Sequence, residues 1–339
     1  MSELKMNSNN QTIKQSDNYL VWLEWPEKCF RVDAEALRYL RTAVPKGSRV
    51  LRTRSEAAFL RALPKATHAI TWRFKAEWFV LAPKLKVLAT PAAGQEFVPT
   101  KGPKGVKIHF GHYHGQIMSE SVAAFVLAWA HGFFAVRQAP KSCRAWPRTW
   151  LSDKCTEVAG TRAVILGYGH VGRAIGAKLA ALGVDVYGIT RHGAYRQVEK
   201  RGGGGQRIFK IPLSTSTSSL DLFREADWLI LALPSTTGTD NFLNAALLRK
   251  LPRKCVVINV GRGNAVEEKA LYRSLKTKRL AGAYLDVRKH EPSATVLEAP
   301  GYVKGLADLP NCIVMPHASA FSPRYLIHCF EELKDDGCL

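Results

Sequence analysis

The chain has 339 residues, 46% of them hydrophobic, which predicts about two globular domains on a prior of ~150 residues per domain. Its net charge of +21 comes from Lys and Arg spread along the whole chain, a pattern more typical of a solvated surface than of a nucleic-acid-binding arm, so we expect no nucleic acid partner. Seven cysteines, an odd number without a Cys-x-x-Cys pair, argue against a disulfide framework or a zinc site and favour a reducing, cytoplasmic location.

The first hundred residues alternate between strand and helix patterns. The opening twenty residues are polar and lack an apolar stretch, so we expect no secretory signal there. Residues 68–72, 85–89 and 106–110 are predicted strands, and residues 34–41 and 56–63 are predicted helices. This alternation indicates a parallel sheet covered by helices.

A long apolar helix is predicted over residues 117–137. Its apolar run, Val122–Val136, is interrupted by His131 and Gly132, so we expect no membrane span. The Pro- and Trp-containing residues 140–150 read as a connection. Strand-like runs then recur in the second half of the chain, at residues 163–166, 184–189, 228–231, 255–260, 281–285 and 313–315. Six strands separated by helical stretches predict a doubly wound sheet.

A glycine turn follows the first of these strands. Gly167-Tyr-Gly169-His170-Val171-Gly172 connects a buried strand run to an amphipathic helix, the context that a dinucleotide-binding turn requires. Gly167 permits the turn, Gly169 lets a pyrophosphate approach the backbone, and Gly172 lets helix and strand pack closely. The helix that starts at His170 and Val171 offers its amide groups to the phosphates.

The residues after the second strand predict which dinucleotide is preferred. An NAD enzyme usually has an acidic residue there to bind the ribose hydroxyls. This chain has Thr190 followed by Arg191, with Arg196 and Arg201 farther along. Because no carboxylate repels a 2′-phosphate and a guanidinium can pair with it, we predict NADP as the preferred cofactor and NAD as the alternative.

Three charged residues late in the chain stand in distinctive strings. Arg262 lies in Asn-Val-Gly-Arg-Gly, Glu291 precedes Pro292, and His317 follows Met-Pro. A cation, a carboxylate and an imidazole downstream of a nicotinamide site are the groups needed to reduce a 2-keto acid. The cation holds the substrate carboxylate, the imidazole supplies a proton, and the carboxylate keeps the imidazole protonated.

With these strings in the same order, residues 85–321 resemble the D-isomer-specific 2-hydroxyacid dehydrogenase family. The resemblance implies an α/β fold of two doubly wound parallel-sheet domains: a Rossmann-type cofactor domain (112–317) and a flavodoxin-like substrate domain (1–111 and 318–339), with a cleft between them. It also implies a helix over 325–333 that returns to the substrate domain, and a homodimer. Arg262 would bind the substrate, His317 would be the general acid, and Glu291 would raise the pKa of His317. Asp286 would lie near the nicotinamide carboxamide, and Leu233 and Pro234 would line the ring pocket.

The substrate side departs from the family pattern. Where the family often has Gly-x-Gly, this chain has Ala92-Ala93-Gly94, and we expect Ala93 and Gly94 to contact the substrate. Trp72 and Arg73 follow a strand and are expected to line the pocket, which would suit a small acid such as glyoxylate or hydroxypyruvate.

Two features leave other interpretations open. His109, His112 and His114 are spaced like metal ligands, but no complete ligand set is evident, so we predict no metal and favour a hinge or pocket-lining role. A nucleotide-sensing regulatory scaffold or a nucleic-acid-binding protein on the same fold remains the alternative to an enzyme.

Overall fold

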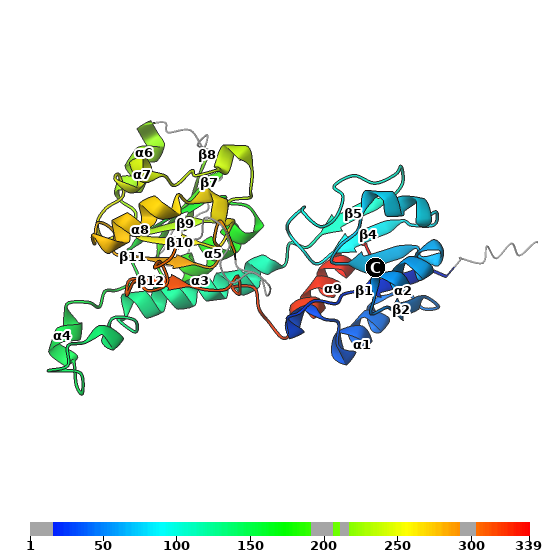
Figure 1. Ribbon diagram of the computed structural model, residues 1–339, viewed down its shortest axis with the longest axis horizontal. Helices are drawn as coiled ribbons and strands as arrows, with labels where there is room; N and C mark the ends of the chain where they lie inside the picture. Colours follow the sequence, from blue (N-terminus) through cyan, green and yellow to red (C-terminus); the bar gives the residue numbers. More distant parts are fainter. Residues whose placement is uncertain (1–15, 191–205, 211–216, 292–302) are drawn as a thin grey trace, which may run out of the picture. The chain divides into compact units, whose positions relative to one another are not determined.

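The computed structural model describes residues 16–190, 206–210, 217–291 and 303–339, and for 206–210 and 217–220 it describes the backbone alone. Two compact units make up the chain, residues 1–111 with 323–339 and residues 112–322. Both are α/β units built on a parallel sheet (Figure 1). The chain returns to the first unit at Pro323, whereas the sequence analysis places the return at residue 318.

The first unit has a five-stranded sheet of order β2-β1-β3-β4-β5, with every pair parallel. Its elements are β1 (Asn18–Trp22), α1 (Ala34–Ala43), β2 (Arg49–Arg52), α2 (Glu56–Ala62), β3 (His68–Thr71), β4 (Val87–Thr90), β5 (Lys107–Phe110) and α9 (Tyr325–Asp335). This strand order is the flavodoxin-like one. The inner strands β3 and β4 are buried at every position, as expected for parallel strands covered on both faces.

The last helix, α9, is anchored to β5 by polar contacts. His109 is buried on β5, and its Nε2 lies 2.9 Å from an Asp336 carboxylate oxygen. Lys107 donates from Nζ to the Asp336 carbonyl oxygen at 2.8 Å. The predicted helix over 325–333 is therefore present, and these bonds attach it to the first unit. His109 serves this attachment within the first unit, whereas His112 and His114 belong to the second unit.

The second unit has a seven-stranded parallel sheet of order β12-β11-β10-β9-β6-β7-β8. Its elements are α3 (His114–Ala130), α4 (Arg148–Ser152), β6 (Arg162–Leu166), α5 (His170–Ala181), β7 (Asp185–Thr190), β8 (Gln206–Lys210), α6 (Thr217–Arg224), β9 (Trp228–Leu231), α7 (Ala245–Leu248), β10 (Val256–Asn259), α8 (Glu268–Lys276), β11 (Gly282–Leu285) and β12 (Cys312–Val314). The six predicted strands are present, and β8 is a seventh. The order reverses between β6 and β9, so ligands are expected at the carboxyl ends of these two strands.

Helix α3 covers the sheet together with α5. A Cβ built on Gly115 would lie 3.0 Å from the carbonyl oxygen of His170, so the two helices approach closely at their N-terminal ends. Figure 1 shows the segment around α4 lying apart from the sheet of its own unit. Among the described residues no helix combines the length and apolarity needed to cross a membrane, and all seven cysteines are free thiols.

Candidate active site

The glycine turn has the geometry of a phosphate-binding site. Gly167 has φ +87°, and a Cβ there would lie 2.5 Å from the carbonyl oxygen of Ala232 on the neighbouring β9 loop. A Cβ on Gly172 would overlap the carbonyl oxygen of Gly167, whereas one on Gly169 would meet nothing within 4 Å. The backbone therefore packs closely on the protein side and is open at Gly169. The residues fit a dinucleotide pyrophosphate at the start of α5.

The first two residues of α5 differ in their surroundings. His170 is exposed, and its ring stacks on that of His112, with centroids 4.4 Å apart and planes at 11°. Val171 packs against the core between the sheet and α3. Its expected contribution to a cofactor site is therefore that of its backbone amide. His114 is buried at the start of α3, where its ring stacks on Tyr113 at 4.3 Å.

The end of β7 carries no carboxylate. Thr190 is its last residue and is half-buried. The carbonyl oxygen of Ile189 accepts from the amides of Gly167 and Tyr168, both at 3.0 Å, which joins the end of β7 to the glycine turn. Arg191, Arg196 and Arg201, on which the NADP prediction depends, lie outside the described residues.

Arg262 is held between two close backbone contacts. A Cβ on Gly261 would lie 2.5 Å from the amide nitrogen of Leu233, and one on Gly263 would overlap the carbonyl group of Arg288. Only glycine allows these approaches. The Arg262 guanidinium donates from Nη1 to the Gly261 carbonyl oxygen at 3.0 Å. The loop after β10 thus joins the loops after β9 and β11.

Asn259, a residue that the sequence analysis did not identify, connects the Arg262 loop to the end of β10. Its Oδ1 accepts from the Gly261 amide and its Nδ2 donates to the Arg262 carbonyl oxygen, both at 3.2 Å. Asn259 is 1% exposed. A buried amide at the last position of a strand is the signal that could have identified it.

Leu233 and Pro234 follow β9. The Leu233 side chain is 3% exposed and packs into the core of the second unit, whereas Pro234 is exposed. Both positions lie beside the Gly261 contact. Their expected place at a nicotinamide ring stays a prediction.

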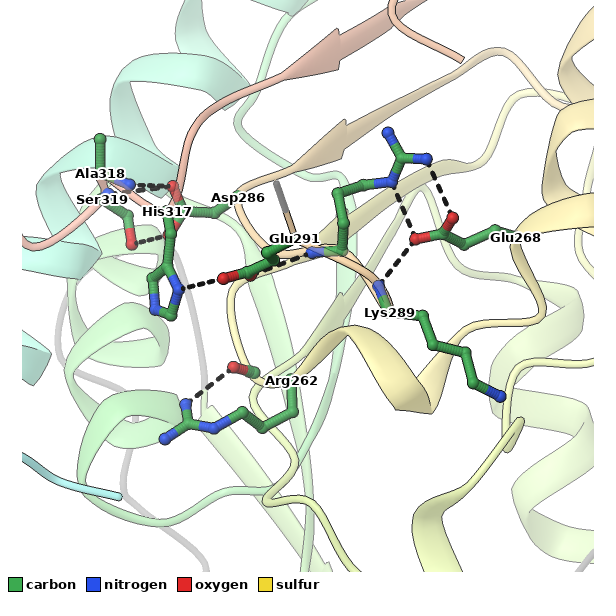
Figure 2. A network of polar contacts seen from close by, with 10 residues as sticks. Arg262, Glu268, Asp286, Lys289, Glu291, His317, Ala318 and Ser319 are labelled. Atoms are coloured by element: carbon green, nitrogen blue, oxygen red, sulfur yellow. Dashed lines mark hydrogen bonds and ion pairs between the residues drawn. The ribbon is translucent and has the colours of Figure 1, made fainter. Parts of the chain in front are cut away.

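Glu291 and His317 form the central pair of the site (Figure 2). His317 Nδ1 lies 3.0 Å from Glu291 Oε2, and the two side chains are 53% and 40% exposed. His317 has φ +55°, in the left-handed region. The structure therefore brings together an imidazole and a carboxylate that are separated by 26 positions in the sequence.

Asp286 holds the loop that carries His317. It is 1% exposed, and its Oδ1 accepts from the amides of Ala318 and Ser319, both at 2.9 Å. The Ser319 hydroxyl donates to its Oδ2, and the His317 amide donates to its carbonyl oxygen at 2.8 Å. These contacts give Asp286 a structural task at the site in addition to its predicted place near the carboxamide.

The surroundings of the pair raise the pKa of His317 and lower the pKa of Glu291. The hydrogen bond to Glu291 raises the pKa of His317 above its ordinary value; burial and Arg262 oppose this, whereas the charges of Glu291 and Asp286 add to it. Burial raises the pKa of Glu291, but the bond and charge of His317, the Arg288 amide and the charge of Arg262 outweigh it, so that this pKa is lowered. Arg262 thus acts on both members of the pair.

The four predicted substrate residues lie in the first unit. Trp72 is only 7% exposed, packs against Trp25, Phe30 and Tyr325, and donates from its indole to the Phe30 carbonyl oxygen at 2.9 Å. The aromatic neighbours hold its ring in place, and its expected contact with the substrate stays a prediction.

The other three predicted substrate residues remain accessible. Arg73 is exposed, with its guanidinium 5.6 Å from the Trp25 ring centroid. Ala93 is exposed and Gly94 half-buried, in the irregular segment that follows β4. No group of three His, Cys, Asp or Glu side chains in the described ranges could hold a metal ion.

Comparison with known proteins identifies the family. Residues 123–319 match the model of the D-isomer specific 2-hydroxyacid dehydrogenase NAD binding domain. A glyoxylate reductase of Korarchaeum cryptofilum is 30% identical over 256 residues, covering 73% of this chain and 70% of the relative. A glyoxylate/hydroxypyruvate reductase B of Pectobacterium carotovorum is 31% identical over 244 residues, covering 70% and 69%.

Among solved structures, that of D-2-hydroxyisocaproate dehydrogenase has the same fold, with a TM-score of 0.71, 15% identity and 94% of each chain covered. The architecture of two parallel-sheet units is thus the fold that the sequence predicts. Since the family match spans more than half of the 339 residues, this chain is a member of the D-isomer specific 2-hydroxyacid dehydrogenase family of oxidoreductases.

Proposed function

We propose that this enzyme reduces a small 2-keto acid, of the glyoxylate or hydroxypyruvate kind, to the D-2-hydroxy acid. The observation that carries the proposal is the 3.0 Å contact between His317 Nδ1 and Glu291 Oε2, in a site where the charge of Arg262 acts on both groups. A proton donor, its partner and an anion-binding cation are the side chains that such a reduction requires.

The cofactor would be held by the second unit. The turn from Gly167 to Gly172 and the amides that begin α5 would bind the pyrophosphate, while Asp286, Leu233 and Pro234 would lie toward the nicotinamide. When bound, the dinucleotide supplies the hydride that adds to the keto carbon. Residues 112–322 would form the cofactor domain, and residues 1–111 with 323–339, including Arg73, Ala93 and Gly94, would contribute to substrate binding.

Arg262 and His317 would share the reacting group of the substrate. The guanidinium of Arg262 would bind the carboxylate, because its planar fork of donors matches two oxygens. Glu291 occupies Nδ1 of His317, so Nε2, on the other side of the ring, would donate the proton to the keto oxygen. The raised pKa of His317 keeps this acid protonated to higher pH.

We also propose that NADP is preferred over NAD. Thr190 ends β7 where an NAD enzyme usually has a carboxylate, and Arg191 follows it in the sequence. A guanidinium there would pair with a 2′-phosphate, whereas a carboxylate would repel it.

A screen of cofactor oxidation tests both proposals. We expect NADPH oxidation with at least one of glyoxylate, hydroxypyruvate, pyruvate and a phosphorylated 2-keto acid, with formation of the D isomer. Steady-state kcat/KM should be higher with NADPH than with NADH. Absence of turnover with every acid would refute the reductase, and equal or better efficiency with NADH would refute the cofactor preference alone.

A homodimer is the oligomeric state we propose. Three large apolar side chains after α3 are exposed: Phe133 at 67%, Val136 at 37% and Trp146 at 80%. Exposed large apolar side chains close together in the sequence are candidates for an interaction site. Sedimentation equilibrium should give twice the chain mass, and a single-chain mass at micromolar concentration would contradict the proposal.

Replacing Glu291 should change the pH dependence of the reaction. Glu291 raises the pKa of His317, so the protonated acid persists to higher pH. In Glu291→Gln the pKa of His317 should fall toward its ordinary value, and the alkaline limb of kcat for reduction should move to lower pH. At pH values below the alkaline limb of either profile, the wild type and Glu291→Gln should have similar kcat.

A second His–Glu pair provides the control for this measurement. His328 Nδ1 lies 2.9 Å from Glu331 Oε2 on α9, in the first unit and outside the loops that carry the site. Glu331→Gln should leave the pH profile of kcat unchanged. If Glu291→Gln also leaves it unchanged, Glu291 does not tune the acid.

A further inference from the structure

Glu268 and Arg288 form a buried ion pair beside the loop after β11 that carries Glu291. Neither side chain belongs to the candidate site described above. Glu268, the first residue of α8, is 6% exposed, and Arg288 is 5% exposed. Arg288 donates from Nε to Glu268 Oε1 at 2.8 Å and from Nη2 to Oε2 at 2.9 Å. The pair is thus bidentate, the geometry in which an arginine–carboxylate contact is most directional.

The same carboxylate also binds the backbone of the loop after β11. The Lys289 amide donates to Glu268 Oε1 at 2.9 Å, as Figure 2 shows. The Arg288 amide donates to Glu291 Oε1 at 3.2 Å. Glu291 Oε2 in turn lies 3.0 Å from His317 Nδ1. One chain of contacts therefore runs from Glu268 through the loop to the imidazole.

The opposite side of this loop lies against the residue that follows Arg262. A Cβ on Gly263 would overlap the peptide group between Arg288 and Lys289. The peptide is therefore held between the Glu268 carboxylate and the Gly263 backbone. Arg288 also donates from Nη2 to the Val303 carbonyl oxygen at 3.2 Å, which fixes its side chain from a third segment.

We propose that Glu268 and Arg288 are positioning residues: their ion pair holds residues 286–291 so that the Glu291 carboxylate stays against Nδ1 of His317. The role of the His317 imidazole in catalysis rests on the proposed function. Stability alone is a weak reason for such a pair, because buried ion pairs can often be replaced by apolar side chains of similar size without loss of stability.

The charged groups that act on His317 come from two strand ends, and His317 follows a third. Glu291 and Asp286 follow β11, Arg262 follows β10, and His317 itself follows β12. The Glu268–Arg288 pair is net neutral. Removing both charges together therefore changes the geometry at Glu291 while leaving the net charge of the chain unchanged.

The test is an NMR titration of His317 in the full chain with isotopically labelled histidine, its signal identified by loss in His317→Asn. The double variant Glu268→Met with Arg288→Met should lower the pKa of the His317 imidazolium by roughly half a unit or more, about threefold in the protonation equilibrium. Glu268→Gln should shift it in the same direction. Leu275→Ala, a buried position on the same helix α8, is a destabilising control that should leave this pKa unchanged.

Thermal unfolding separates positioning from stability. Glu268→Gln leaves the buried Arg288 guanidinium without a carboxylate partner. Its Tm should therefore fall further than that of the double variant. A double variant with a recovered Tm and a lowered His317 pKa supports the proposal. One with a wild-type His317 pKa, or with the same pKa as Leu275→Ala, overturns it.

The titration does not depend on turnover, so the two proposals fail in different ways. If the wild type reduces no 2-keto acid but the pKa shifts as expected, the proposed function is refuted and the positioning is retained. If the wild type is active, kcat of the double variant should fall most above its own His317 pKa.

Discussion

Replacing His317 with asparagine is expected to lower kcat for keto-acid reduction by about 10²- to 10⁴-fold, the contribution typical of a general acid. This corresponds to roughly 3–5 kcal/mol of transition-state stabilisation. In the proposed function the His317 imidazolium would donate the proton, and Glu291 raises its pKa through the Nδ1 contact. Cofactor affinity, measured by fluorescence titration, should change little, since the glycine turn lies on other elements.

Asparagine is the substitution that preserves the backbone. His317 has φ +55°, and Asn tolerates this left-handed conformation better than Ala or a branched residue. The loss of turnover can then be assigned to the proton rather than to a displaced loop.

The matched control is His328→Asn on α9, where an Nδ1–carboxylate contact of 2.9 Å is lost outside the site. It should keep the wild-type kcat. A His317→Asn enzyme with a kcat within threefold or so of wild type would contradict general acid catalysis by this residue, since a lost acid costs far more.

Most of the fold follows from the alternation of buried strands with amphipathic helices. The sequence analysis did not predict β1, β2 or β8; β1 is an inner strand, whereas β2 and β8 are edge strands of their sheets. Their sequences, Arg-Val-Leu-Arg and Gln-Arg-Ile-Phe-Lys, have polar ends and few apolar positions, because an edge strand is covered less completely than an inner one.

Helix boundaries were less predictable than helix existence. Helix α3 begins at His114 and ends at Ala130, whereas the helix predicted from the apolar pattern runs from residue 117 to residue 137. Gly132 has φ +72°, which no longer fits an α-helix, although the residues beyond it remain apolar. Phe133 and Val136 are instead exposed, so the pattern there reflects a surface and not a buried helix face.

The site residues were predictable where they follow strands. Arg262, Glu291 and His317 come after β10, β11 and β12, and the carboxyl ends of parallel strands meet at one edge of the sheet. Glu268 and Arg288 were not predicted, because charged residues 20 positions apart read as separate surface charges. Their burial becomes visible only when α8 packs beside the loop after β11.

Arg262→Gln is the other substitution with a large expected effect. Kcat/KM for a 2-keto acid should fall by about 10³-fold, because truncating one partner of a hydrogen-bonded charge pair typically costs 2–5 kcal/mol. Arg262→Lys should recover part of this loss, since lysine keeps the charge but not the two-pronged geometry. Arg273→Gln, at an exposed arginine on α8, should leave kcat/KM unchanged.

A substrate without a carboxylate separates binding from a general disturbance of the site. For a simple aldehyde, the wild type and Arg262→Gln should differ by less than about tenfold, because the anion that Arg262 would bind is absent. A similar loss for both substrates would mean that the substitution disturbs the loop rather than carboxylate binding. We expect the small difference on the aldehyde, because the close contacts at Gly261 and Gly263 fix the loop through backbone atoms that the substitution leaves in place.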